Sequence, residues 1–160
     1  MKLLHRTYRP FLFVVALGCL TLAASEAFAA IKNLAVVVAA GSKLPDVTLA
    51  ELTKLCKGSL KAWPDGRSFT LVMKDPTSPE MHVAVQRLFG VAPTDAMTAI
   101  AKINEARPLI KIVATDDDVF RVVASTPGAV GIVDVYAINS AVKVLHIDGK
   151  LPFDIGYALK

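Results

Sequence analysis

Cysteine and tryptophan are scarce in this sequence of 160 residues, which contains two cysteines and one tryptophan. Cys19 lies in an N-terminal apolar run that we expect to be removed, which leaves Cys56 without a partner. No internal disulfide is then expected. Cys56 falls on the apolar face of a predicted helix, which favours a buried, inert thiol over a catalytic nucleophile.

Sequence patterns typical of catalytic and nucleotide-binding sites are also missing. There is no G-x-S-x-G, H-E-x-x-H, Walker or G-x-G-x-x-G pattern. His82 and His146 lie far apart in the sequence, so we expect structural histidines rather than a metal site. The adjacent acids of residues 116–118 lack the alternate spacing of a calcium loop and suit a helix N-terminus instead. We therefore expect no enzyme activity, no catalytic residues, no metal and no cofactor.

Basic residues are in modest excess, with a net charge of +4 at pH 7. They do not form a stripe interleaved with aromatic residues, so nucleic acid is not an expected partner.

Long apolar runs are limited to residues 11–24, which carry no charge. This run is shorter than the roughly 20 residues that span a bilayer. It is flanked by three basic residues and an A-x-A cleavage pattern: Lys2, Arg6, Arg9 and Ala27-Phe28-Ala29. This arrangement predicts a secretory signal peptide over residues 1–29, cleaved after Ala29, and a domain over residues 30–160.

Two alternatives to this cleavage remain open. An uncleaved signal segment would act as a membrane anchor. Ala16-Leu17-Gly18-Cys19 is a loose lipobox, which would make the chain a lipoprotein modified at Cys19.

The rest of the sequence alternates predicted strands with predicted helices. Thr48 and Glu51 form a capping box at one helix start, Ser78 and Pro79 suit the start of a second, and Thr94 is expected to cap a third, with Met97 and Ile100 inward. A fourth opens at residues 115–118. Strands are expected at residues 32–40, 69–73, 109–114, 129–134 and 142–147. This alternation predicts an α/β domain with a mixed, mostly parallel sheet flanked by helices.

The loop from Lys74 to Glu80 joins a predicted strand to a predicted helix. Such ends offer backbone N–H groups to anions, and Lys74, Thr77 and Ser78 add charge and hydroxyl donors. These three residues are the candidate ligand-binding site. The alternative is that Ser78 only caps the helix while Lys74 is solvated, and Asp75 and Glu80 would both repel an anion.

Residues 34–149 resemble the periplasmic phosphate-binding proteins of ABC transporters, with their PBP-like domain. The first matching motif consists of Leu49, Glu51, Leu52, Gly58, Trp63, Asp65 and Gly66. The second lies within Val123–Gly149 and includes Thr126-Pro127-Gly128-Ala129. The resemblance implies an exported, periplasmic, solute-binding-like protein. Its ligand would be phosphate or another small oxyanion, and its partner a transporter permease or another envelope protein.

The sequence departs from that family in the ligand loop and in length. Lys74 stands where the family has arginine, and Pro79 and Glu80 replace glycine and threonine. Pro79 has no N–H to donate, and lysine cannot form the bidentate hydrogen bonds that arginine forms with an oxyanion. The family is two-lobed, whereas residues 30–160 are enough for one lobe. We therefore expect a single lobe with weak or altered oxyanion binding, or a non-catalytic envelope scaffold that reuses the lobe.

Overall fold

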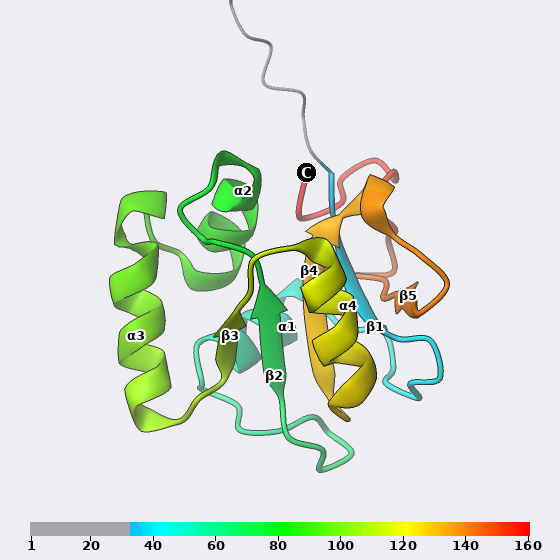
Figure 1. Cartoon of the computed structure of the whole chain (residues 1–160), viewed down its shortest axis with the longest axis horizontal. Coiled ribbons are helices and arrows are strands. Elements are labelled where there is room, and N and C mark those ends of the chain that lie inside the picture. The colour runs from blue at the N-terminus through cyan, green and yellow to red at the C-terminus, as the bar shows by residue number, and fades with distance from the viewer. Residues whose placement is uncertain (1–32) are drawn as a thin grey trace, which may run out of the picture.

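The computed structural model describes residues 33–160. The predicted signal peptide, its cleavage site and Cys19 lie outside the described residues. The strands are β1 (Leu34–Ala39), β2 (Thr70–Met73), β3 (Ile110–Ile112), β4 (Ala129–Asp134) and β5 (Val142–Val144), as Figure 1 shows. The main helices are α1 (Leu49–Cys56), α3 (Ala96–Ala106) and α4 (Asp116–Ser125).

Shorter helical pieces connect these elements. The segment after β2 begins as a 3₁₀ turn, η1 (Pro79–Met81), continues as α2 (His82–Ala84) and ends as a π turn, η2 (Val85–Phe89). Two further 3₁₀ turns are η3 (Pro93–Asp95) and η4 (Val135–Ala137). In the described part of the chain, no helix has the length and apolar character needed to cross a membrane.

The sheet has the strand order β3-β2-β4-β1-β5. β2 pairs in parallel with β3 and β4, whereas β1 pairs antiparallel with β4 and β5. Only β1 therefore runs against the other strands. The predicted mixed, mostly parallel sheet flanked by helices is confirmed.

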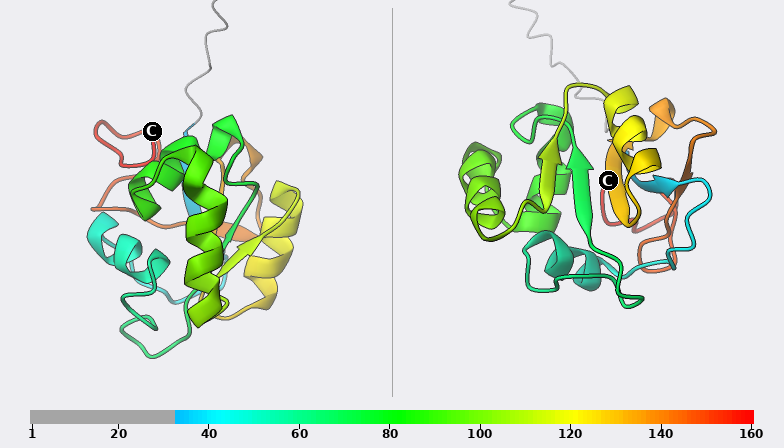
Figure 2. Two further views of the ribbon diagram at one scale, coloured as in Figure 1. Left: turned by 90° about the vertical axis from the view of Figure 1, so that its left-hand side faces the viewer. Right: turned by 60° about the horizontal axis from the view of Figure 1, so that its bottom comes forward.

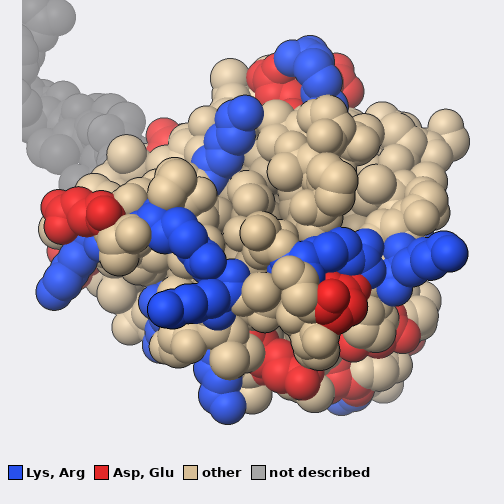
Figure 3. Space-filling model, turned by 90° about the horizontal axis from the view of Figure 1, so that it is seen from below, with Lys and Arg blue, Asp and Glu red and all other residues tan. Residues whose placement is uncertain are grey.

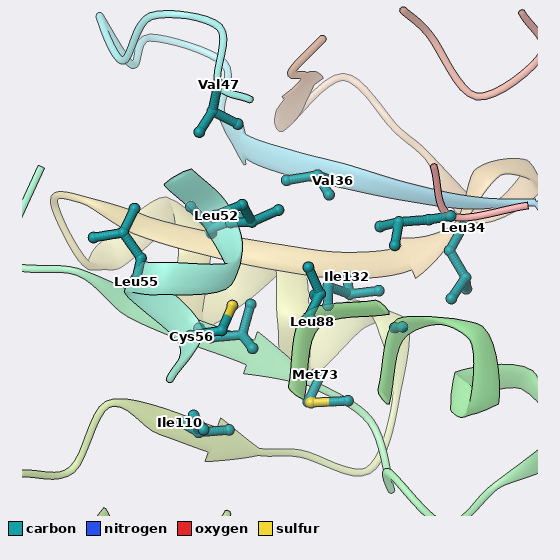
Figure 4. Packing of buried hydrophobic residues seen from close by; sticks show 14 of the residues in the cluster. Leu34, Val36, Val47, Leu52, Leu55, Cys56, Met73, Leu88, Ile110 and Ile132 are labelled. Atoms are coloured by element: carbon teal, nitrogen blue, oxygen red, sulfur yellow. The ribbon is translucent and has the colours of Figure 1, made fainter. Parts of the chain in front are cut away.

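Both faces of the sheet are covered, which explains why β1 is apolar along its whole length. Leu34, Val36 and Val38 face the larger core cluster, shared with α1, η2 and α3. Ala35 and Val37 face a second cluster under α4. Figures 1 and 2 show α4 on its own side of the sheet. Figure 4 shows side chains of α1 and η2 among those of the strands.

Gly131 of β4 lets α4 lie close to the sheet. A Cβ atom at this position would lie 2.5 Å from Cγ1 of Val119 and 3.1 Å from Cγ2 of Val123. Both valines belong to α4, so the absence of a side chain at Gly131 sets how closely α4 can approach the sheet.

Several local predictions are confirmed. The Thr48 side chain accepts a hydrogen bond from the Glu51 N–H, and the Glu51 carboxylate accepts one from the Thr48 N–H. Thr115 caps α4 by accepting from the Asp118 N–H. The thiol of Cys56 is buried, and this burial raises its pKa.

The prediction for the third helix is wrong at its start. Thr94 lies inside η3 and caps nothing, because the chain makes a 3₁₀ turn before α3 begins at Ala96. Ile100 is buried as predicted, but Met97 is 49% exposed.

β5 is also shorter than predicted. Beyond Val144 the His146 N–H donates to the Asp46 carboxylate, away from the β1 ladder.

Candidate functional site

The carboxyl ends of β2, β3 and β4 lie at one edge of the sheet, because these three strands are parallel. Lys74 directly follows β2, Asp116 begins α4 shortly after β3, and Asp134 ends β4. We call this end of the sheet, where the three strands finish, the ligand edge; it is at the top of Figure 1. Open α/β sheets bind ligands at such an edge, so it is the natural place for a site.

Lys74 is held by two carboxylates. Its Nζ atom lies 2.8 Å from Oδ2 of Asp116 and 2.8 Å from Oε1 of Glu80, and its side chain is only 12% exposed. Partial burial by itself would lower the pKa of this ammonium group. The hydrogen bonds to Asp116 and Glu80 outweigh that effect, so the pKa of Lys74 is raised. Lys74 is therefore a firmly charged and already paired cation.

Thr77 and Ser78 are bonded to Asp75 in the same loop. The Thr77 N–H and Oγ1 donate to Oδ1 of Asp75 over 2.9 and 2.7 Å, and the Ser78 hydroxyl donates to the Asp75 carbonyl over 2.7 Å. The backbone N–H of Thr77, and then its hydroxyl, lower the pKa of the Asp75 carboxyl. Ser78 precedes η1 but makes no side-chain cap hydrogen bond.

The sequence assigned the donors of Lys74, Thr77 and Ser78 to a bound anion. In the structure these donors already have acceptors within the protein. Lys74 meets the carboxylates of Glu80 and Asp116, and the Thr77 donors meet that of Asp75. Two carboxylates hold the one ammonium group, and a third holds the donors of Thr77. The oxyanion site predicted at Lys74, Thr77 and Ser78 stays a prediction, and these contacts set the competition that a bound anion must overcome.

Asp116 is the residue of this cluster that sequence reasoning missed. The sequence pattern predicts Asp116 only as one of three acids at a helix start, whereas its pairing with Lys74 spans 42 positions. The parallel pairing of β2 with β3 is the signal that brings the two together. Oδ1 of Asp116 is buried and has no hydrogen-bond partner among the described residues. The unused hydrogen-bonding atom at this point is therefore an acceptor and not a donor.

His82 and His146 serve separate segments. His82 Nε2 lies 3.2 Å from the Thr77 carbonyl, and His146 Nδ1 lies 3.0 Å from the Asp46 carboxylate. Within residues 33–160, no group of three or more His, Cys, Asp and Glu side chains is placed to hold a metal ion.

Trp63 connects the two sequence motifs. Its indole N–H donates to the Gly128 carbonyl over 2.9 Å, and its ring packs edge-on against Phe69 at 5.6 Å between centroids. Trp63 is buried, as predicted. The Trp63-Pro64-Asp65-Gly66 turn and the Thr126-Pro127-Gly128 turn are therefore one structural unit, far from Lys74 at the opposite edge of the sheet.

An apolar patch lies near the ligand edge. Tyr136 belongs to η4, which follows β4, and is 81% exposed. Its ring lies 6.1 Å from that of Phe153, which is also exposed, and Ile155 is 94% exposed. We call Tyr136, Phe153 and Ile155 the aromatic patch. Large exposed apolar side chains that gather in this way are typical of interaction surfaces.

The sequence matches no protein-family model and no curated protein. Solved structures do match. An ABC-type phosphate transport receptor from Vibrio cholerae is 19% identical with a TM-score of 0.62, over 80% of this chain and 53% of that chain. The chain has the fold of about half of a phosphate-binding protein. A putative phosphate ABC transporter substrate-binding protein with bound phosphate, from Clostridium perfringens, is 15% identical with a TM-score of 0.56. That match covers 74% of this chain and 46% of the other.

A third match, PstS from Borrelia burgdorferi, is 16% identical with a TM-score of 0.54. It covers 76% of this chain and 49% of PstS. The chain thus spans about half the length of the phosphate-binding proteins that it matches. The resemblance predicted from the sequence motifs is confirmed as a likeness of fold, which leaves the ligand to be argued from the site itself.

Proposed function

We propose that this chain is an exported, non-enzymatic, single-lobe relative of phosphate-transport binding proteins that binds small oxyanions weakly at Lys74, Thr77 and Ser78. The observation that carries the proposal is the position of Lys74, at the ligand edge of a fold shared with proteins that include one with bound phosphate. This edge is where such sheets hold their ligands.

Weak affinity follows from the contacts of the loop. An incoming oxyanion must displace Glu80 or Asp116 from Lys74, and Asp75 from Thr77. Pro79 offers no N–H, and a charge near a helix end contributes only about 0.3–1 kcal/mol. Three or four such contacts reach about 4 kcal/mol at most, which corresponds to a millimolar Kd. A single lobe also encloses little of a ligand's surface.

Phosphate titration followed by amide NMR tests this proposal. Shifts should concentrate in residues 74–81 with a millimolar Kd, and Lys74→Ala should abolish them. Lys111→Ala is the matched control, because Lys111 is exposed on the neighbouring β3 and lies outside the loop. Micromolar binding would contradict the argument from an open half-site, and no shift at millimolar phosphate would remove oxyanion binding from the proposal.

Export to the periplasm is part of the same proposal. It rests on the predicted signal peptide over residues 1–29 and on the likeness to transport receptors. Mass spectrometry of the exported protein should find an N-terminus at Ala30. An intact Met1 would indicate a membrane anchor, and a lipid on Cys19 would indicate a lipoprotein.

A second candidate function is a non-catalytic scaffold in the cell envelope, and the aromatic patch favours it. Tyr136, Phe153 and Ile155 expose apolar surface near the ligand edge. A permease, another envelope protein or a separate chain could cover this surface. Crosslinking from position 155 in intact cells should capture a defined partner, and Tyr136→Ser with Phe153→Ser should abolish the capture. Retained capture by the double variant would assign the contact to another surface.

A further inference from the structure

An open hollow of about 660 Å³ lies at the edge of the sheet opposite the ligand loop. Its lining includes Leu109, which directly precedes β3, whereas Lys74 directly follows the parallel strand β2. The hollow lies between the end of α1 and the end of α3. Ala99, Ile103 and Leu109 give it an apolar floor.

Four cations line this hollow and no acid does: Lys57, Lys61, Lys102 and Arg107. None of the four forms an ion pair with another residue in the described part of the chain. Seen from below, Lys and Arg side chains form a band across the molecule, with acidic side chains beside it, mostly below it and at its left end (Figure 3). Unpaired positive charge is therefore concentrated around an apolar concavity.

Helix capping explains only half of these cations. Lys57 and Arg107 are the C-cap residues of α1 and α3, where a positive charge stabilises the helix end. Lys61 and Lys102 have no such role. The Arg107 guanidinium donates to the Lys61 carbonyl over 2.6 Å, which ties the loop after α1 to the end of α3. This bond holds one wall of the hollow in place while leaving the other donors of the guanidinium group for a ligand.

We propose that this hollow binds an amphipathic anion, namely a phosphate or carboxylate group attached to a short apolar chain. The cations would hold the charged group, and the floor of alanine, isoleucine and leucine would cover the apolar chain. Small-molecule sites commonly combine an apolar lining with charged or polar groups that fix the orientation of the ligand. The site is separate from the Lys74 loop and does not depend on the function proposed for that loop.

The test titrates the purified chain with octyl phosphate, inorganic phosphate and octyl glucoside, and follows amide shifts. Octyl phosphate should shift Gly58, Ala99 and Ile103 and bind more tightly than either other probe. Lys61→Gln with Lys102→Gln should weaken it about tenfold, the product of two exposed ion contacts each worth roughly threefold. Lys43→Gln with Lys111→Gln removes the same charge elsewhere and should leave binding unchanged.

Three results would overturn the proposal: equal weakening in both double variants, equal binding of octyl glucoside, or shifts confined to residues 74–81. A second arm distinguishes a membrane lipid from a soluble ligand as the natural source. Sedimentation with phosphatidylglycerol vesicles, but not with phosphatidylcholine vesicles, supports a lipid headgroup when the Lys61/Lys102 variant fails to sediment. Octyl phosphate binding without sedimentation supports a soluble ligand.

Discussion

Removing the carboxylates that hold Lys74 should strengthen oxyanion binding. We consider the double variant Glu80→Gln with Asp116→Asn, which keeps the shapes of both side chains and neutralises both charges. Each carboxylate lies 2.8 Å from the Lys74 ammonium group. In the variant, an incoming phosphate meets the ammonium group without a competing charge.

The expected gain follows from the charge that is removed. An oxygen of a phosphate bonded to the Lys74 ammonium group would lie roughly 5 Å from each carboxylate oxygen, because each carboxylate lies 2.8 Å from Nζ and a charge-assisted hydrogen bond to the phosphate is about as long. Two charges at this distance repel by about 1 kcal/mol at the dielectric constant of water and by about 3 kcal/mol at an effective value near 20. The side chains of Glu80 and Asp116 are about one-fifth exposed, and solvent screening favours the lower figure. Two such terms give about 2 kcal/mol, or an affinity about 30-fold tighter.

The assay is calorimetric or NMR titration with phosphate, accompanied by a melting curve to verify that the variant is folded. The matched control, Asp95→Asn with Glu105→Gln, makes the same charge change on exposed residues at the start and near the end of α3, neither of which is bonded to Lys74. A folded double variant that binds no more tightly than the parent chain would refute the competition argument. An equal gain in the control would assign the effect to net charge.

Three further predictions concern stability. Trp63→Ala should lower the free energy of unfolding by about 3–5 kcal/mol, because it opens a cavity and removes the donor to Gly128; an unchanged melting temperature would contradict this. Gly131→Ala should cost about 1–3 kcal/mol through its clash with α4, whereas Gly41→Ala, which meets open space, should be close to neutral in the same denaturation assay. The pKa of Asp75 is lowered in the folded state, so its contribution is complete above the ordinary value of 3.8 and lost as the pH falls through the folded value. Melting curves should therefore show that Asp75→Asn destabilises the protein near neutral pH, with a difference that shrinks as the pH falls below 3.8.

Local signals in the sequence predicted local structure well. The capping box of Thr48 and Glu51 and the strand at residues 129–134 are present as expected, because both depend on neighbouring residues alone. The start of α3 was not predicted, since Pro93 begins a 3₁₀ turn that shifts the register of the following helix and leaves Met97 exposed. Local patterns do not distinguish a 3₁₀ turn from the first turn of an α-helix.

Long-range pairings explain what the sequence left unpredicted at the candidate site. The loop containing Lys74 was found from its strand-to-helix pattern. Its partner Asp116 follows a different strand, and their contact depends on β2 lying beside β3. No residue pattern within either segment indicates that β2 and β3 are neighbours in the sheet. Of the two carboxylates that compete for Lys74, the sequence therefore indicated Glu80 but not Asp116.

The reversed direction of β1 has a practical consequence for experiments. Leu34, at the start of β1, pairs with Asp134 at the carboxyl end of β4, and its N–H donates to the Leu159 carbonyl over 3.2 Å. Both ends of the described chain therefore emerge beside the Lys74 loop and the aromatic patch. An affinity tag, fluorescent fusion or surface tether at either end will crowd that edge, whereas the turn at Gly66 on the opposite edge offers an attachment point that leaves it clear.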